Sequence, residues 1–262
     1  MTSTDFGDTH KELLGCLRTL PMEILVVSAC SGDKLYDDPP IRCDGTDSDM
    51  RGELMRKYPD YVAPAAEMYV GDEHQIVREA ADNLREHGEV SWRILSAGYG
   101  LISENEEIVA YDCSLSDIAP VRDRVERLGY NPGSLTIDET RRVIGRETGA
   151  VPDLMKALND GFDLVFLTLS EPYLVAISEA LSDVPKDVTV ISFASKGSRS
   201  YTGDAYWVPA TESIRSELGS SWFTVRGELL RNLAGVADTS TLERIASDPA
   251  SVEDSLDVPL KR

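Results

Sequence analysis

Two reactive side chains follow an apolar segment near the start of the chain. Glu23 to Ala29 is a continuous aliphatic and β-branched run, typical of a strand buried on both faces, and Cys30 and Lys34 come directly after it. A thiolate is a nucleophile. A cleft lysine binds phosphate as a point charge, or acts as a base when desolvation lowers its pKa. We predict that both residues serve a site; the alternatives are a small buried thiol and a surface lysine.

A second polar group follows the apolar run from Trp92 to Leu95. The segment Ser96 to Gly100 breaks that run with two glycines, which permit positive φ and close approach to a ligand. Tyr111 and Asp112 then supply a phenol and a carboxylate. We predict that Tyr99 and Tyr111 stack on a planar base, and that Asp112 moves a proton or anchors the ligand. The alternative is an ordinary turn in which both phenols line the core.

Two further strand-like runs, 162–170 and 187–193, also end in hydroxyl and basic residues. The strand, long loop, helix and strand between 23 and 95 predict a right-handed βαβ unit with parallel strands. The carboxyl ends of such strands meet at one edge of the sheet, where open α/β folds bind ligands. The sequence therefore predicts a three-layer α/β fold with a mainly parallel sheet, a helical insertion and one cleft.

The predicted cleft collects residues from all four strand ends. Its predicted catalytic residues are Lys34, Asp112 and Cys30. Its predicted ligand-binding residues are Ser28, Tyr69, Ser96, Gly98, Tyr99, Gly100, Tyr111, Ser170, Ser195 and Lys196.

The chain divides by pattern into an arm, a body and a tail. Residues 1–20 are polar and form the predicted N-terminal arm, and residues 21–237 form the α/β domain. Helical spacing with interruptions at about 117–157 predicts the helical insertion within it. Residues 238–262 are acidic and weakly patterned, and we predict an acidic C-terminal tail.

The composition is strongly acidic. Asp and Glu number 46 against 26 Lys and Arg, which gives a formal net charge of -20 over 262 residues. The acids are spread along the chain, so they predict a solvated acidic surface adapted to a salt-rich, halophilic cytoplasm. No apolar run reaches the roughly 20 residues that span a bilayer, and no secretory h-region follows Met1. We therefore expect a cytoplasmic protein without a membrane partner.

Several kinds of cofactor chemistry are not indicated. The four cysteines, at 16, 30, 43 and 113, have no metal-binding spacing, and we expect reduced thiols and no metal. Neither a dinucleotide-binding nor a P-loop fingerprint is present, so no cofactor is predicted. No histidine lies at a convincing strand end for a Ser-His-Asp hydrolase.

These motifs in this order resemble the YaaA-like superfamily. The residues that carry the resemblance are Ser28-Ala-Cys30, Lys34, Glu67-Met-Tyr69, Leu95-Ser-Ala-Gly-Tyr-Gly-Leu101 and Tyr111-Asp112. The superfamily includes the peroxide-stress YaaA proteins, uncharacterised prokaryotic domains and, more distantly, the core domain of archaeosine synthase. Met68 stands where leucine is usual, no proline precedes Tyr111, and nothing after Asp117 aligns. The resemblance implies an α/β fold with a polar cleft and a link to nucleic acid.

Three functions remain open from the sequence. The first is an enzyme or enzyme-like protein that handles a nucleobase, nucleotide or nucleic acid in the cleft. The second is a non-catalytic, DNA-binding stress-response protein, with a groove lined by arginines such as Arg141, Arg142 and Arg146. The third is a scaffold whose cleft is vestigial.

The acidic surface makes a prediction about salt. Raising KCl from tens of millimolar to molar should raise the melting temperature, because counter-ions screen the repulsion among the carboxylates. Differential scanning fluorimetry across that range is the measurement. Equal melting temperatures at both ends would contradict the halophilic interpretation.

Overall fold

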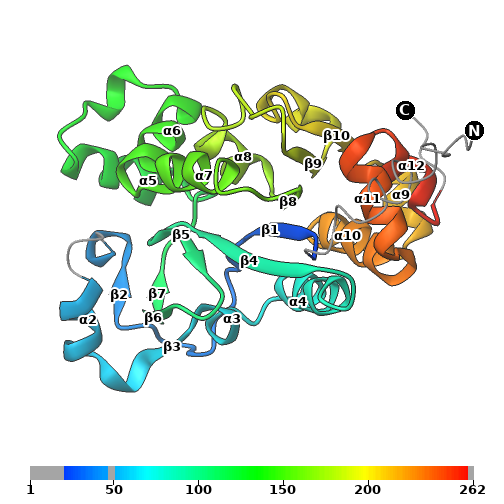
Figure 1. The fold of residues 1–262 in the computed structure, drawn as a ribbon. Helices are drawn as coiled ribbons and strands as arrows, with labels where there is room; N and C mark the ends of the chain where they lie inside the picture. The colour runs from blue at the N-terminus through cyan, green and yellow to red at the C-terminus, as the bar shows by residue number, and fades with distance from the viewer. Residues whose placement is uncertain (1–20, 47–50, 259–262) are drawn as a thin grey trace, which may run out of the picture.

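A six-stranded sheet forms the centre of the protein. The structure, a computed structural model, describes residues 21–46 and 51–258. The strand order in the sheet is β10-β9-β8-β1-β4-β5 (Figure 1). The strands are β1 (Glu23–Ala29), β4 (Glu89–Ser96), β5 (Gly100–Ser103), β8 (Leu164–Thr168), β9 (Thr189–Ala194) and β10 (Tyr206–Pro209).

Five of these strands run parallel, as the sequence predicted. β1 lies between β4 and β8, with Val26 opposite both Trp92 and Phe166. Only β5 is antiparallel, because the chain turns back on β4 through residues 97–99. The residues Ile24 to Val27 are fully buried, although their side chains alternate between the two faces. Both faces of β1 are therefore covered by other parts of the protein, and the predicted α/β class with a mainly parallel sheet is confirmed.

Two helix groups pack on the sheet. α4 (Asp72–Leu84) packs against α10 (Val225–Val236), and these helices contact β1, β4, β8 and β9. α6 (Ile137–Glu147), α7 (Ala150–Leu158) and α8 (Glu171–Ile177) form the second group, in which α7 contacts β5. Figure 1 shows the second group, with α5 (Ile118–Arg127), gathered on one side of the strands. The predicted helical insertion coincides with α5, α6 and α7.

The remaining elements are short. Two small sheets pair β2 (Ile41–Arg42) with β7 (Tyr111–Asp112) and β3 (Val62–Pro64) with β6 (Glu107–Val109). The other helices are α2 (Arg51–Lys57), α3 (Ala65–Met68), α9 (Glu212–Glu217), α11 (Thr239–Ser247) and α12 (Ser251–Ser255). The 3₁₀ turns are η1 (Cys43–Gly45), η3 (Pro59–Tyr61), η4 (Pro132–Ser134) and η5 (Lys196–Tyr201).

Within the predicted acidic C-terminal tail, the chain forms α11 and α12, which pack on the fold. α11 and α12 bury Leu242, Ile245 and Val252, and the Thr189 hydroxyl of β9 donates to the Ala246 carbonyl at 2.6 Å. The acidic residues lie on the exposed sides of these short helices. The segment is therefore amphipathic, although its composition is acidic. The predicted N-terminal arm, residues 1–20, lies outside the described residues.

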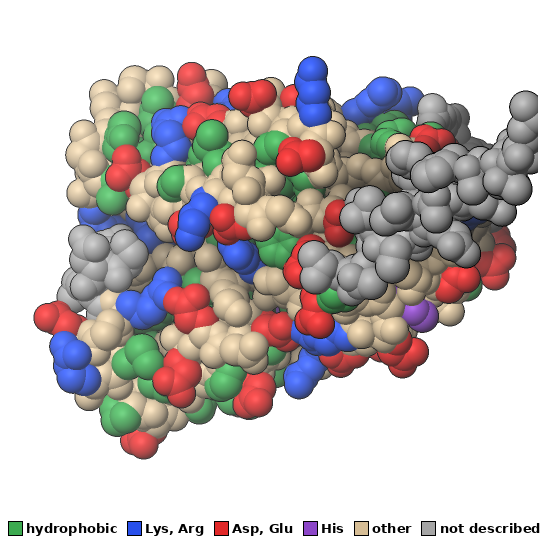
Figure 2. All heavy atoms as spheres, in the orientation of Figure 1, with side chains coloured by type: hydrophobic (Ala, Val, Ile, Leu, Met, Phe, Trp, Pro, Cys, Tyr) green, Lys and Arg blue, Asp and Glu red, His purple; other side chains and the backbone are tan. Residues whose placement is uncertain are grey.

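Charges of both signs share the surface. On the face shown in Figure 2, acidic and basic side chains are interspersed. Within the described residues, no helix has the length and apolar character needed to cross a membrane.

Close packing of α6 on α8 depends on Gly145. A Cβ at this position would lie 1.9 Å from the Ala176 carbonyl oxygen. Gly145→Ala should therefore destabilise the fold by about 1–3 kcal/mol, because overpacking forces the helices apart. A Cβ added at Gly235 in α10 would have no contacting heavy atom within 4 Å. Gly235→Ala should stabilise by about 0.5–1 kcal/mol through helix propensity. Urea unfolding measures both; a stabilised Gly145→Ala would contradict this packing.

Candidate functional site

The loops after β1 and β4 lie side by side, as the parallel pairing predicted. The amide of Cys30 donates to the Leu95 carbonyl at 3.0 Å, and the amide of Ala97 lies 3.4 Å from Cys30 Sγ. The Tyr173 hydroxyl of α8 is 3.1 Å from the same sulfur. Cys30 is thus held where β1 and β4 end against α8, and the residue is 8% exposed.

A buried hydroxyl network lies behind this junction. The Tyr111 hydroxyl is 2.9 Å from that of Tyr69 and 2.7 Å from Ser96 Oγ. Ser96 Oγ in turn accepts from the amides of Gly98 and Tyr99. Burial raises the pKa values of the Tyr111 and Tyr69 phenols well above the usual range of tyrosine. Both hydroxyls therefore stay protonated and can donate hydrogen bonds. The network fixes the 96–100 turn against β7.

Tyr99 and Tyr111, predicted to stack on a planar base, pack against each other in this structure. Their rings are 3% and 0% exposed and pack edge to face at 5.1 Å, so neither offers a face to a base. The Tyr99 hydroxyl donates to the Val109 carbonyl, and Arg51 lies over the Tyr99 ring. The predicted alternative, phenols that line the core, describes them better.

The two glycines of the turn serve packing. Gly100 has φ of +75°, and a Cβ there would lie 2.3 Å from the Thr148 carbonyl oxygen. A Cβ on Gly98 would come within 3.0 Å of both Thr46 and Tyr111. Arg124 of α5 binds the Ala97 and Gly98 carbonyls at 2.7 and 3.1 Å. The glycines therefore allow α5, α7 and the tyrosine cluster to approach the turn.

Ser28 also belongs to the core. Its hydroxyl accepts a hydrogen bond from the Trp92 indole at 2.9 Å, and Ser28 is only 1% exposed. The side chain therefore satisfies a buried donor, and Ser28 does not line the cavities described below.

One cavity, which we call the main cavity, opens at the carboxyl ends of β1 and β8. The strand order β4-β1-β8-β9-β10 is one of the two common doubly wound orders, and its connections change direction between β1 and β8. Ligands in such folds bind at this switch point. The main cavity has a volume of about 490 Å³ and is lined by residues 29–33, 71–73, 113, 114, 116, 170, 172, 173, 221, 223, 224 and 226.

Cys30 and Ser170 line the main cavity, whereas Lys34 and Asp112 do not. Lys34 and Asp112 line a neighbouring hollow of about 440 Å³, which we call the lysine cavity. It shares Gly32 and Asp33 with the main cavity. The predicted catalytic trio is thus divided between two adjoining cavities, because the 31–34 loop separates them.

Lys34 is held in a partly buried position. Its ammonium donates to the Gly32 carbonyl at 3.2 Å and lies 4.7 Å from the centre of the Tyr111 ring. Burial lowers the pKa of Lys34, opposed by the negative fields of Cys30, Asp112 and Asp33. This lowered pKa increases the fraction of neutral amine, which is the form that acts as a base.

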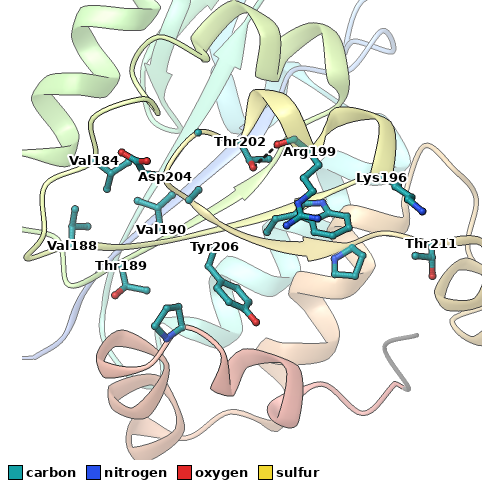
Figure 3. A pocket seen from close by; sticks show the side chains of 15 residues that line it. Val184, Val188, Thr189, Val190, Lys196, Arg199, Thr202, Asp204, Tyr206 and Thr211 are labelled. Atoms are coloured by element: carbon teal, nitrogen blue, oxygen red, sulfur yellow. Dashed lines mark hydrogen bonds between the residues drawn. The ribbon is translucent and has the colours of Figure 1, made fainter. Parts of the chain in front are cut away.

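Ser195 and Lys196 do not join these residues. Lys196 is exposed and lines a separate hollow of about 610 Å³ along β9 and β10, together with Arg199, Trp207 and apolar residues (Figure 3). Ser195 caps η5, where its hydroxyl accepts from the Ser198 amide. The prediction of one cleft for all four strand ends is therefore wrong, because β9 lies one strand beyond the switch point.

The main cavity contains residues that sequence reasoning missed. Glu73 at the start of α4 and Arg226 in α10 both line it and form an ion pair at 3.0 Å, and burial raises the pKa of Glu73. Phe223 lies on the rim with 82% of its surface exposed. In the sequence, the adjacent aromatic residues Trp222 and Phe223 just before a helix could have indicated Phe223 as a cavity residue. No sequence pattern indicated Glu73 and Arg226, because their contact depends on the packing of α4 against α10.

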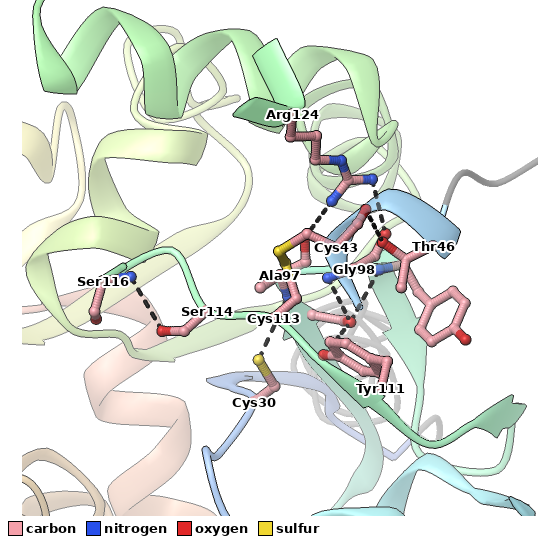
Figure 4. Close-up of a disulfide and its surroundings, with 12 residues drawn as sticks. Cys30, Cys43, Thr46, Ala97, Gly98, Tyr111, Cys113, Ser114, Ser116 and Arg124 are labelled. Atoms are coloured by element: carbon pink, nitrogen blue, oxygen red, sulfur yellow. Dashed lines mark hydrogen bonds between the residues drawn. A yellow bond between two sulfur atoms is a disulfide. The ribbon is translucent and has the colours of Figure 1, made fainter. Parts of the chain in front are cut away.

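The cysteine prediction is wrong for one pair. Cys43 and Cys113 form a disulfide with a Cα–Cα distance of 4.9 Å, next to the turn at Gly98 (Figure 4). Cys30 is a free thiol. Within the described part of the chain, no group of three or more His, Cys, Asp and Glu side chains is placed to hold a metal ion.

The described histidines lie away from the cavities. His74 is buried, with Nε2 3.0 Å from the Ala66 carbonyl and its ring centre 4.7 Å from that of Trp92. Burial lowers its pKa to about 4, so it is neutral at pH 7. His74 and His87 line none of the cavities named above, and His10 lies outside the described residues.

The hydroxyl network generates a prediction about stability. Tyr111→Phe should destabilise the fold by about 1–3 kcal/mol, because Tyr69 and Ser96 would lose a buried partner. Tyr130→Phe is the matched control, since that ring is on the surface and its hydroxyl binds Glu147. The control should unfold like the unmodified protein in urea. Equal stability of the two variants would show that the network is dispensable.

Comparison with known proteins gives one partial match. Residues 55–126, which run from α2 into α5, match the model of a family described as a family of unknown function (DUF6884). The matched region includes Tyr69, the 96–100 turn and Tyr111. No curated protein and no solved structure matches the chain.

Proposed function

We propose that the chain binds a nucleobase or nucleoside in the main cavity, as an enzyme or enzyme-like member of the YaaA-like superfamily. The observation that carries this proposal is the cavity at the β1/β8 switch point, with a thiol in its wall and an exposed aromatic ring on its rim. Its volume of about 490 Å³ lies within the range of small-molecule sites. We also propose that the two helix groups make this a three-layer fold, since both faces of β1 are buried.

The motif residues of the resemblance support the kinship because they contact one another. Cys30, Ser96 and Tyr111 come from three separate segments, yet they lie in one cluster with Tyr69. Lys34 covers the Tyr111 ring. A motif dispersed over 85 positions, from 28 to 112, that gathers at a cavity edge is consistent with a shared site.

The charges of the main cavity favour a neutral heterocycle over a phosphate. Its lining has three carboxylates, on Asp33, Asp72 and Glu73, but only the guanidinium of Arg226, which already pairs with Glu73. Carboxylates accept hydrogen bonds from the amino and imino edges of bases. Serine hydroxyls at 31, 114, 116, 170 and 221 add both donors and acceptors. A polyanion would meet repulsion here, because the negative charges outnumber the positive one.

Phe223 provides the aromatic surface that the buried tyrosines cannot. Stacking on an aromatic side chain contributes about 1–3 kcal/mol per base. Cys30 Sγ lies in the wall of the same cavity, between the Tyr173 hydroxyl and the Ala97 amide. In this arrangement Phe223 would hold a planar ring, and the thiol would face an electrophilic carbon or remain a contact.

The alternative is a non-catalytic DNA-binding stress-response protein. It was based on a groove lined by Arg141, Arg142 and Arg146, but these arginines bind other groups of the protein. Arg141 is 9% exposed, and its Nε donates to the Leu115 carbonyl. Arg142 donates to Ser178 Oγ, and Arg146 pairs with Glu179. These arginines fasten α6 to its neighbours, so the nucleobase proposal is preferred.

A binding experiment tests the proposal. Purified protein would be titrated by calorimetry with purine, deazapurine and pyrimidine bases, their nucleosides, the matching 5′-phosphates and a duplex DNA. We expect a base or nucleoside to bind more tightly than its phosphate. Phe223→Ala should weaken that binding about 5- to 100-fold, because a stacking face is lost.

Trp222→Ala is the matched control. Trp222 is the neighbouring exposed aromatic residue but does not line the main cavity. This variant should bind as the unmodified protein does. Equal losses in the two variants, preferred binding of duplex DNA, or no binding of any compound would each contradict the proposal.

A further inference from the structure

The disulfide continues a very short strand pair. β2 and β7 pair over two residues only, Ile41 opposite Tyr111 and Arg42 opposite Asp112. Cys43 and Cys113 are the next residues of each strand, and they are joined by the disulfide. A two-residue ladder has little stability of its own. The covalent bond therefore adds a restraint to the packing that buries Ile41 and Thr46 and keeps the 41–46 segment against β7.

The segment on the Cys113 side of this bond forms part of the main cavity. Cys113, Ser114 and Ser116 line the cavity, and Tyr111, two residues before Cys113, belongs to the buried hydroxyl network. Figure 4 shows the disulfide on the strand that leads to Ser114 and Ser116, with Cys30 on the adjacent loop. A change at the disulfide is thus placed to change the wall that faces Cys30.

Small molecules have a route to the disulfide from two sides. Cys113 lines the main cavity and also a second hollow of about 250 Å³, which we call the acidic cavity. Cys43 lines the acidic cavity as well. The two residues are only 5% and 7% exposed, so a reductant must enter through one of these cavities. A disulfide buried in a continuous core would lack such access.

We propose that the Cys43–Cys113 disulfide is a thiol-exchange site whose reduction opens the wall of the main cavity beside Cys30. The reductant is a small dithiol. One of its thiolates attacks Cys113 Sγ, which forms a mixed disulfide and releases Cys43 as a thiolate that takes up a proton. The second thiol of the dithiol then attacks the mixed disulfide. This step releases Cys113, which is also protonated, and leaves the dithiol as a cyclic disulfide, so two electrons pass to the protein.

The first arm of the test measures whether the bond exchanges in the folded protein. The oxidised full chain is incubated with dithiothreitol without denaturant, and intact mass and thiol content are followed over time. We expect two new thiols while circular dichroism still reports a folded protein. A bond that is reduced only when urea unfolds the chain would overturn the proposal, because it would then be a structural bond without access.

The second arm measures the cavity wall without a nucleobase ligand. Iodoacetamide alkylation of Cys30 is quantified by peptide mass spectrometry in the unmodified oxidised chain and in Cys43→Ser/Cys113→Ser. We expect alkylation at least about fivefold faster in the double variant, the lower end of typical coupling between sites. An unchanged rate would overturn the proposal, since the cavity would then not depend on the disulfide.

Ile245→Ala controls for a general loss of stability. Ile245 is fully buried in α11 and lines neither the main nor the acidic cavity. This variant should be less stable but should alkylate Cys30 at the rate of the unmodified chain. A rate as fast as that of the double variant would mean that overall loosening causes the effect. The proposed nucleobase function is not needed for any arm, so the two proposals fail independently.

Discussion

The buried hydroxyl of Tyr111 is the interaction on which the arrangement of this region depends. A phenol with no exposed surface must find hydrogen-bond partners within the protein, because an unpaired buried hydroxyl costs free energy. Tyr69 and Ser96 supply them from two other segments of the chain. Ser96 also receives the amides of the 96–100 turn. One network therefore holds the loop after β4, the C-terminal end of α3 and β7 in a fixed relation.

That fixed relation positions the residues that line the two cavities. Cys30 is held by the turn on one side and by Tyr173 of α8 on the other. Lys34 covers the Tyr111 ring and lines the lysine cavity. The tyrosines thus form the support of the proposed site, while Cys30, Glu73 and Phe223 line the main cavity. Rigid support behind a few exposed groups is what a preorganised site requires.

The disulfide adds a covalent restraint to the same region. It joins two segments 70 residues apart, immediately after the only two residues through which β2 and β7 pair. Tyr111 is thereby held by hydrogen bonds at its hydroxyl and by a cross-link two residues further along the chain. The redox state of Cys43 and Cys113 and the shape of the main cavity are therefore linked through one short strand.

The sequence determined the parallel sheet, the strand-end loops around Cys30 and Ser96, and most of the helices. These features depend on local periodicity and apolar runs, such as 23–29, which neighbouring residues encode directly. Only the tertiary structure decided which polar residues face a cavity. Ser28, Tyr99 and Tyr111 turned out to be buried, and Ser195 and Lys196 lie beyond the switch point. The Glu73–Arg226 pair and the disulfide join residues 153 and 70 positions apart. Such meetings depend on how helices and short strands pack, and packing is a property of the whole fold.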